Sequence, residues 1–245
     1  MWNSVAHVFR REMSGYFTTP IAYVFLVIFL VLSGVFTFQL GHFFPRGQAD
    51  LVAFFTYHPW LYLFLIPALT MRLWAEERKS GSIELLLTLP IRAVEAVLGK
   101  FFAAWCFATM ALGLTFPLWL VVNYLGNPDN GVILASYVGS ILLAGGFLAM
   151  GASLSAMTRN QVIAFVVTVT AGLGFVLSGH PVVLGFLEGW TPLVIRETVA
   201  SFSFLTHFSH ISKGVIDLRD AIYFGSLIAF WLYVNVLVLE LRRGE

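Results

Sequence analysis

Two clusters of side chains in this sequence could do chemistry. Residues 75–90 read Ala-Glu-Glu-Arg-Lys-Ser-Gly-Ser-Ile-Glu-Leu-Leu-Leu-Thr-Leu-Pro, and residues 207–220 contain two histidines and two aspartates. Adjacent carboxylates can take part in proton transfer, and histidines three residues apart on a helix can share a metal ion. Each cluster is therefore a candidate catalytic or metal-binding site.

Neither cluster completes a known catalytic pattern. Intramembrane proteases with a Glu-Glu-x-x-x-Arg motif need an arginine where this chain has Gly81. A serine nucleophile in a Gly-x-Ser-Gly motif needs glycine after Ser153, but Leu154 follows it. The chain also lacks the Gly-x-x-x-x-Gly-Lys-Ser/Thr loop that binds nucleotide phosphates. We therefore expect no catalytic residue, and no ATPase activity in this chain.

A metal site is also disfavoured. His207 and His210 could face one ion, but Asp217 and Asp220 lie seven to thirteen residues further on. We expect these histidines to be polar groups on the external face, with no metal and no cofactor bound by this chain.

The composition is that of a membrane protein. The 245 residues are 59% hydrophobic and 11% charged, against roughly 25% charged in an average soluble domain. Six stretches contain no Asp, Glu, Lys or Arg and are long enough to cross a bilayer as helices. The sequence predicts an all-α membrane protein with six transmembrane helices, near residues 21–42, 57–74, 99–124, 132–157, 161–179 and 221–240.

Positive charges give the orientation of these spans. Because cytoplasmic loops retain Lys and Arg, the side with more of them is the cytoplasmic one. Only Arg46, Arg196, Lys213 and Arg219 fall opposite to the termini. The other ten predict cytoplasmic termini and one large cytoplasmic loop: Arg10, Arg11, Arg72, Arg78, Lys79, Arg92, Lys100, Arg159, Arg242 and Arg243.

Three segments outside the spans have their own character. Residues 1–18 alternate apolar and polar positions at helical spacing, which predicts an amphipathic helix in the membrane interface. Residues 180–220 are too apolar for a free loop, yet Pro181 and Pro192 prevent a full crossing, so we expect a re-entrant or interfacial hairpin there. The third segment is the cytoplasmic loop 75–95.

Small residues recur at four-residue spacing in two spans, where they would let neighbouring helices approach closely. This pattern predicts packing within the subunit, with a dimer contact as the alternative, for Gly145, Ala149, Ser153, Ala164, Thr168 and Gly172. The spans hold no Asp, Glu, Lys or Arg at mid-depth, which disfavours proton-coupled transport.

The loop 75–95 contains a short predicted helix. Ser80 or Ser82 can cap its N-terminus, Glu84 lies in its first turn, and Pro90 ends it. Ile83, Leu86 and Leu87 then form one apolar side. This side either folds back on the membrane domain or inserts into a groove on a soluble subunit.

The loop resembles the pattern after the second span of ABC-2 type transporter permeases. That pattern of acidic residues, a basic residue, Gly, Ser/Thr-x-Glu, a Leu-rich turn and Pro is similar to Glu76, Glu77, Arg78, Gly81, Ser82, Glu84, Leu85, Leu86 and Pro90. Residues 205–220 resemble the segment before the last span in the gliding-motility (GldF-like) branch. The resemblance in span number and N-terminal helix extends over nearly the whole chain.

The resemblance implies a single permease domain, residues 1–245, of a bacterial plasma membrane exporter. It implies a partner ATPase chain that binds ATP and Mg and docks on Glu76, Glu77, Arg78, Gly81, Ser82, Ile83, Glu84, Leu86, Leu87 and Pro90. It also implies a dimer with a second copy or a homologous permease, and the net charge of +1 gives no reason to expect a nucleic-acid partner. The alternative function is a membrane scaffold that recruits a partner without transport.

Overall fold

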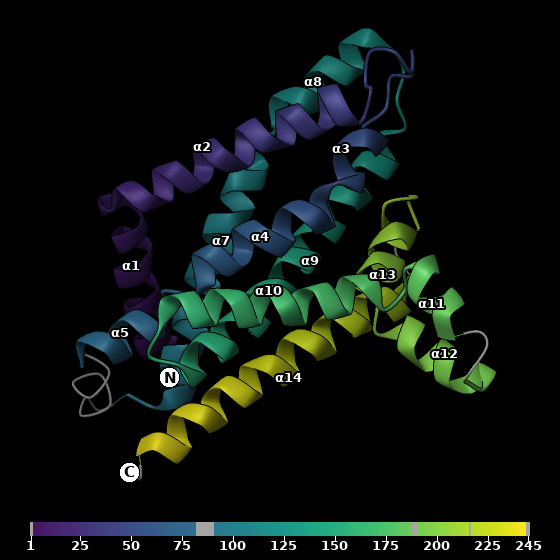
Figure 1. The fold of residues 1–245 in the computed structure, drawn as a ribbon. Coiled ribbons are helices and arrows are strands. Elements are labelled where there is room, and N and C mark those ends of the chain that lie inside the picture. Colours follow the sequence, from purple (N-terminus) through teal and green to yellow (C-terminus); the bar gives the residue numbers. More distant parts are fainter. Residues whose placement is uncertain (1, 82–90, 188–190, 216, 244–245) are drawn as a thin grey trace.

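The computed structural model describes residues 2–81, 91–187, 191–215 and 217–243. Within these ranges the chain is helical and contains no strand, in agreement with the all-α prediction (Figure 1). The helices are α1 Trp2–Thr18, α2 Pro20–Val35, η1 Phe36–Leu40, α3 Val52–Thr56, α4 His58–Thr70, α5 Ala75–Ser80, α7 Ala93–Gly113, α8 Phe116–Leu125, α9 Asn130–Met157, α10 Gln161–Leu177, α11 Pro181–Leu187, α12 Leu193–Ser201, α13 Phe204–Ile211 and α14 Leu218–Arg243.

Four helical stretches in the described residues are long and apolar enough to cross a membrane. They are Ala22–Leu40, Ala93–Leu125, Asn130–Met157 and Leu218–Leu241. The other two predicted spans, 57–74 and 161–179, correspond to α4 and α10, which have 13 and 17 residues. The chain is thus a multi-pass membrane protein, in which α4 and α10 are shorter than the four long apolar stretches.

Helix α9 is the centre of the bundle. In its most apolar window 67% of the residues are buried, against 22% for the windows in α2–η1 and α14. Glycine, alanine and serine recur along α9, so α4, α7, α10 and α14 all pack against it. The outer helices present most of their apolar surface outward, as helices in lipid do.

The predicted small-residue positions lie in contacts between helices of the same chain. A Cβ at Gly145 of α9 would come within 2.9 Å of Ile228 in α14 and 3.1 Å of Trp105 in α7. A Cβ at Gly172 of α10 would come within 2.9 Å of Phe147 in α9. The other four positions are also buried: Ala149, Ser153, Ala164 and Thr168.

Helix α1 covers most of the predicted amphipathic segment. It packs along α7, and its buried residues are Val5 and Val8. A Cβ at Gly99 of α7 would lie 2.6 Å from the Cβ of Val8, so the two helices touch where α7 has no side chain. Trp2, by contrast, is 73% exposed.

Three short helices, α11, α12 and α13, form the segment predicted as a re-entrant or interfacial hairpin. Helices α11 and α12 pack on each other and lie to one side of the bundle, where they expose Val182, Phe186 and Val194 (Figure 1). Helix α13 packs against α9, α10 and α14 and buries Phe204 and Phe208. The chain from 180 to 220 is therefore helical in part and fixed to the bundle through α13.

The two ends of the bundle differ in charge. Helices α1 and α5 and both chain termini lie toward one end, while α3, α8 and α13 lie toward the other (Figure 1). The first end carries the ten Lys and Arg residues that the sequence assigns to the side of the termini. This is the end at which the loop 75–95 leaves the bundle.

Candidate functional site

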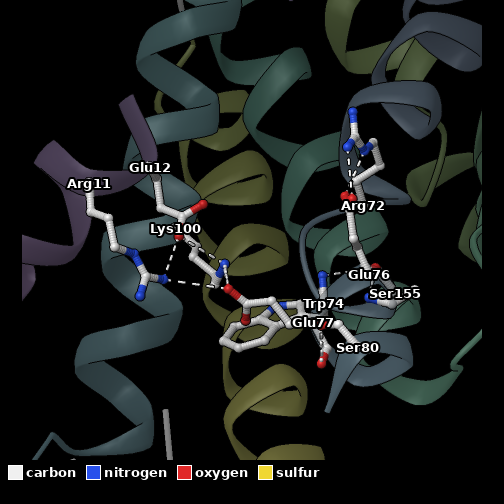
Figure 2. A network of polar contacts seen from close by, with 10 residues as sticks. Arg11, Glu12, Arg72, Trp74, Glu76, Glu77, Ser80, Lys100 and Ser155 are labelled. Carbon is white, nitrogen blue, oxygen red and sulfur yellow. Dashed lines mark hydrogen bonds and ion pairs between the residues drawn. The ribbon is translucent and has the colours of Figure 1, made fainter. Parts of the chain in front are cut away.

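The predicted coupling loop begins in the structure as helix α5, which follows α4 after a short turn. Glu76, Glu77 and Arg78 lie on α5, and Gly81 ends it with φ of +76°, a left-handed conformation that glycine adopts without a steric penalty. These four predicted residues thus lie together on α5 and at its end, and Figure 2 shows Glu76 and Glu77 among their partners. The remaining predicted coupling residues lie outside the described part of the chain: Ser82, Ile83, Glu84, Leu86, Leu87 and Pro90.

Ser155 of α9 fixes the start of α5. Its Oγ accepts hydrogen bonds from the backbone N–H groups of Trp74 and Ala75 at 3.3 and 3.2 Å, and it donates to the Met71 carbonyl at 3.1 Å. The first N–H groups of a helix have no partner within it, so a hydroxyl from a neighbouring helix can satisfy them. The central helix therefore caps the helix that leads into the loop.

Arg78 makes a second connection from α5 to α9. Its guanidinium donates to the carbonyl of Ala156 at 2.5 Å, in the last turn of α9. Positive groups are favourable at a helix C-terminus, where carbonyls have no partner within the helix. The start of α5 and Arg78 in its last turn are thus both attached to the C-terminal end of α9.

The two adjacent glutamates have different partners. Glu76 accepts two hydrogen bonds from Arg72, at 2.7 and 2.8 Å, in a bidentate pair one helical turn apart. Glu77 faces the opposite way, toward α1 and α7 (Figure 2). The Glu-Glu pair therefore is not a pair of cooperating carboxylates for proton transfer, because each glutamate is engaged with a separate cation.

Lys100 joins three helices. Its ammonium group, in α7, lies 2.9 Å from Glu77 of α5 and 3.0 Å from Glu12 of α1, and its side chain is only 3% exposed. Arg11 adds a cation on the outer side, 2.7 Å from Glu12 and 3.4 Å from Glu77. We name this group of four residues, Arg11, Glu12, Glu77 and Lys100, the ion-pair junction.

Trp74 closes the inner side of the ion-pair junction. Its ring is fully buried, and the Lys100 ammonium lies 5.0 Å from the ring centroid, within the range of a cation–π contact. Two carboxylates and an aromatic face together replace the water that a buried lysine loses. This arrangement explains how a lysine is accommodated inside the bundle.

The charges of the site lower the pKa of its carboxyl groups. Burial by itself would raise the pKa of Glu12, but Lys100 and Arg11 outweigh it, and the net shift is downward from 4.5. The hydrogen bonds from Arg72 lower the pKa of Glu76 in the same direction. Both groups are therefore carboxylates at neutral pH.

Sequence reasoning missed Lys100, Glu12, Trp74 and Ser155. The charge pattern counts Lys100 only as one of the cations on the side of the termini, although it precedes an uncharged stretch of 28 residues, 101–128. Glu12 is the only acidic residue among the first 49, on a helix with basic neighbours. Two sequence features could have indicated that Glu12 and Lys100 form a pair. Glu12 is a single negative charge on an amphipathic, otherwise basic helix, and Lys100 is a positive charge at the start of a long apolar stretch.

The cluster of two histidines and two aspartates lies at the other end of the bundle, where His207 and Asp220 are buried and His210 and Asp217 are exposed. His207 is 4% exposed, and its two ring nitrogens lie 2.5 Å from Asp220 Oδ1 and 2.9 Å from the Ser201 carbonyl. Its ring stacks on Tyr223 at 3.8 Å. His207 thus joins α13 to α14, and the expectation that it is a polar group on the external face is wrong. The His210 side chain, by contrast, is 55% exposed.

A bundle of long apolar helices with its charges gathered at the ends has the architecture of a multi-pass membrane protein. The family model described as ABC-2 family transporter protein matches residues 23–237. The chain therefore belongs to the ABC-2 transporter family and is a permease subunit of an ABC transporter. A comparison with curated proteins found no matching relative.

Proposed function

We propose that this chain is the permease of an ABC exporter in a bacterial plasma membrane, driven by a separate ATPase chain that binds ATP and Mg. The ATPase docks on the cytoplasmic loop, and movement of that loop changes the packing of the spans. The observation that carries this proposal is the ion-pair junction, because Glu77 of α5 is tied to both α1 and α7 through Lys100.

The junction couples the loop to the spans in a specific way. Helix α5 leads directly into residues 82–90, and its position is fixed by Ser155, Arg78 and Glu77. A displacement of α5 must either break a largely buried ion pair, which is costly, or carry α1 and α7 with it. Movement of the loop is thereby transmitted to the interfacial helix and the third span.

Contacts between helix ends support six crossings. Glu12 precedes α2, and it contacts Lys100 near the start of α7 at 3.0 Å, so the chain that leaves this end through α2 returns to it. Helix α4, extended by α3 and the turn before α5, lies on that return path. Six crossings would leave both termini on the same side of the membrane, and the ten cations on that side favour the cytoplasm.

Helix α10 reverses direction between α9 and α14. Gly145 and Ser153 of α9 contact Ile228 and Trp231 of α14 in the same order, so these two helices run parallel. Two parallel spans need a crossing between them, and α10 is the apolar helix in that part of the chain. The exposed apolar surfaces of α2, α10 and α14 leave area for lipid and for a second permease copy.

Reconstitution with the ATPase partner tests this function. The change Gly81→Val forces a β-branched residue into a left-handed conformation at the end of α5, so we expect ATPase stimulation by the permease to be lost. Glu84→Ala tests the loop itself. Gly47→Val is the matched control, because Gly47 also has positive φ, +62°, but lies between α2 and α3 at the other end.

The outcome separates transport from scaffolding. Loss of stimulation in Gly81→Val and Glu84→Ala, with normal stimulation in Gly47→Val, supports coupling through this loop. A complex whose ATPase rate is the same with all three variants as with the unchanged chain indicates a passive scaffold and contradicts the proposal.

A further inference from the structure

A cavity of about 190 Å³ lies beside the ion-pair junction, between α1, α2, α4, α5 and α7. Its polar wall is formed by Glu12, Arg72, Glu76, Glu77 and Lys100. Its apolar wall is formed by Ala22 of α2, Ala68 and Leu69 of α4, and Leu73. The cavity thus has a charged part near α5 and an apolar part formed by residues of α2, α4 and the turn after α4.

The depth of the cavity in the membrane follows from its walls. Helix α1 is amphipathic and ends at Thr18, and Pro20 begins the long apolar stretch of α2. The cavity lies at this change of direction and at the end of α4, which is where spans reach the headgroup layer. A ligand with a polar head and apolar chains would match both walls at this depth.

The charges of the wall select the kind of head. Three carboxylates and two cations line the cavity, and Arg11 beside Glu12 brings this group of charges to balance. A head with a single sign of charge would therefore meet like charges on part of the wall. A head with both signs fits better, because its cation can face Glu12 and its anion can face Arg72. A guanidinium has five N–H donors, more than the two hydrogen bonds that Arg72 gives to Glu76 require.

The kind of cation can also be inferred. Carboxylates bind a primary ammonium through N–H hydrogen bonds, whereas a quaternary ammonium has no N–H group and is recognised by aromatic cages. The wall offers carboxylates and one aromatic side chain, Tyr16, which is stacked on Phe107. The Tyr16 hydroxyl is buried and has no hydrogen-bond partner within the described residues, so this residue of the cavity wall has a donor without an acceptor.

We infer that this cavity binds the headgroup of a phospholipid with a primary amine, of the phosphatidylethanolamine type. The ammonium group faces Glu12 beside the ion-pair junction, and the phosphate faces Arg72. The acyl chains follow the apolar wall between α2 and α4. The inference does not depend on the coupling to an ATPase, because it concerns binding by the isolated permease.

Gly15 allows the cavity to be filled without removing a charge. It lines the cavity on α1, and a Cβ at this position would meet nothing within 4 Å. The change Gly15→Leu therefore adds a side chain at the cavity wall, and it also replaces glycine in a helix by a better helix former. Gly225→Leu on α14 is the matched control, since Gly225 is exposed, helical and equally free of neighbours.

The experiment measures lipid retention by native mass spectrometry. The purified chain is mixed with equal amounts of phosphatidylethanolamine, phosphatidylcholine and phosphatidylglycerol in detergent, and bound lipid is counted after release. We expect the unchanged chain and Gly225→Leu to retain the ethanolamine lipid roughly tenfold more than the other two, as loss of charge-assisted hydrogen bonds predicts. In Gly15→Leu this preference should disappear, while the melting temperature stays equal to or above that of the unchanged chain.

Several results would overturn the inference. They are the absence of a preference in the unchanged chain, equal retention of phosphatidylglycerol, or an undiminished preference in Gly15→Leu. Soluble phosphoethanolamine distinguishes the source of the headgroup. If it displaces the lipid at equal concentration, the site recognises a soluble amine phosphate and the membrane lipid is not its ligand.

Discussion

At the scale of the residue, Lys100 decides how this end of the bundle is held together. Its ammonium group is almost fully buried, but it has Glu12, Glu77 and the ring of Trp74 as partners. A buried ion pair adds little net stability by itself, whereas removing one partner leaves the other charge uncompensated. Removal of Lys100 should therefore lower the free energy of unfolding by more than the intact ion pair adds to it.

The first prediction follows from this asymmetry. Lys100→Met leaves two carboxylates and removes the cation between them, so we expect the free energy of unfolding to fall by about 3 kcal/mol. Denaturant titration of the purified chain in detergent measures it. Lys79→Met is the matched control, because Lys79 is exposed on the neighbouring α5, and its effect should stay within about 0.5 kcal/mol. Equal losses in both variants would show that the ion-pair junction does not hold the helices.

Glu12 gives the second prediction, a dependence of stability on pH. Its pKa is lower in the folded protein than the ordinary 4.5, so the folded state binds this proton less readily than the unfolded state. The stabilisation is therefore complete above about pH 4.5 and is lost as pH falls through the lower folded value. The melting temperature should therefore decrease as pH falls below about 4.5, with a smaller decrease in Glu12→Gln. The same decrease in Glu12→Gln would assign the acid sensitivity to other groups.

At the scale of the element, the sequence predicted helix type and approximate position better than helix partners. The long uncharged stretches predicted five helices that the structure contains close to the predicted ranges, namely α2, α7, α9, α10 and α14. They are predictable because an apolar segment in lipid has to satisfy its own backbone hydrogen bonds. The packing of α1 on α7 was not predicted. It depends on Gly99 meeting Val8, a match between distant residues that periodicity within one segment cannot reveal.

The candidate site was predicted in the same partial way. The motif placed Glu76, Glu77, Arg78 and Gly81 on one loop, and the structure places them together on α5 and its end. Their contacts with Lys100, Ser155 and Ala156 come from other helices and follow from tertiary packing alone. Local sequence could therefore identify the segment but not what holds it.

The α1–α7 contact gives the third prediction. A methyl group at Gly99 would lie 2.6 Å from Val8 and 3.1 Å from the Val5 carbonyl, so Gly99→Ala must push α1 away from α7. We expect a loss of about 1–3 kcal/mol in stability, with faster proteolysis of α1. Gly113→Ala in the same helix is the control, because nothing lies within 4 Å there, and it should be neutral or stabilising by at most about 1 kcal/mol. A stable Gly99→Ala with protected α1 would contradict the close contact.

Helix α10 gives the fourth prediction, which tests a predicted packing position. A Cβ at Gly172 would lie 2.9 Å from Phe147 and 3.1 Å from Leu63, whereas Gly174, two residues on, faces open space. Gly172→Ala should therefore destabilise the protein by about 1–2 kcal/mol, and Gly174→Ala should not. Unfolding in detergent compares the two. If Gly174→Ala instead disrupts dimer formation, as size-exclusion chromatography would report, the exposed face of α10 belongs to a contact between copies.

At the scale of the whole molecule, charge and burial divide the bundle consistently. The ion-pair junction, the cavity and the ten cations lie at the end of the termini, while the His207–Asp220 pair and the short helices α11 to α13 lie at the other. The central helix α9 contacts both regions, through Ser155 at one end and Gly139, next to Ile211 of α13, toward the other. A change in the tilt of α9 would thus alter its contacts with α5 at one end of the bundle and with α13 toward the other.

The number of crossings gives the fifth prediction, and α10 is the most demanding case. Its 17 residues span about 25 Å at 1.5 Å per residue, slightly less than a hydrocarbon core of about 30 Å. A short span is accommodated by local thinning of the bilayer at modest cost. Helices α9 and α14 run parallel, so two spans in these positions would require α10 to cross between them. In a Cys106→Ala background, Arg159→Cys should therefore react from the same side as Lys79→Cys, and His180→Cys from the same side as Gln48→Cys. Labelling of Arg159→Cys and His180→Cys from one side would remove α10 from the membrane-crossing helices and, with it, the six-crossing arrangement.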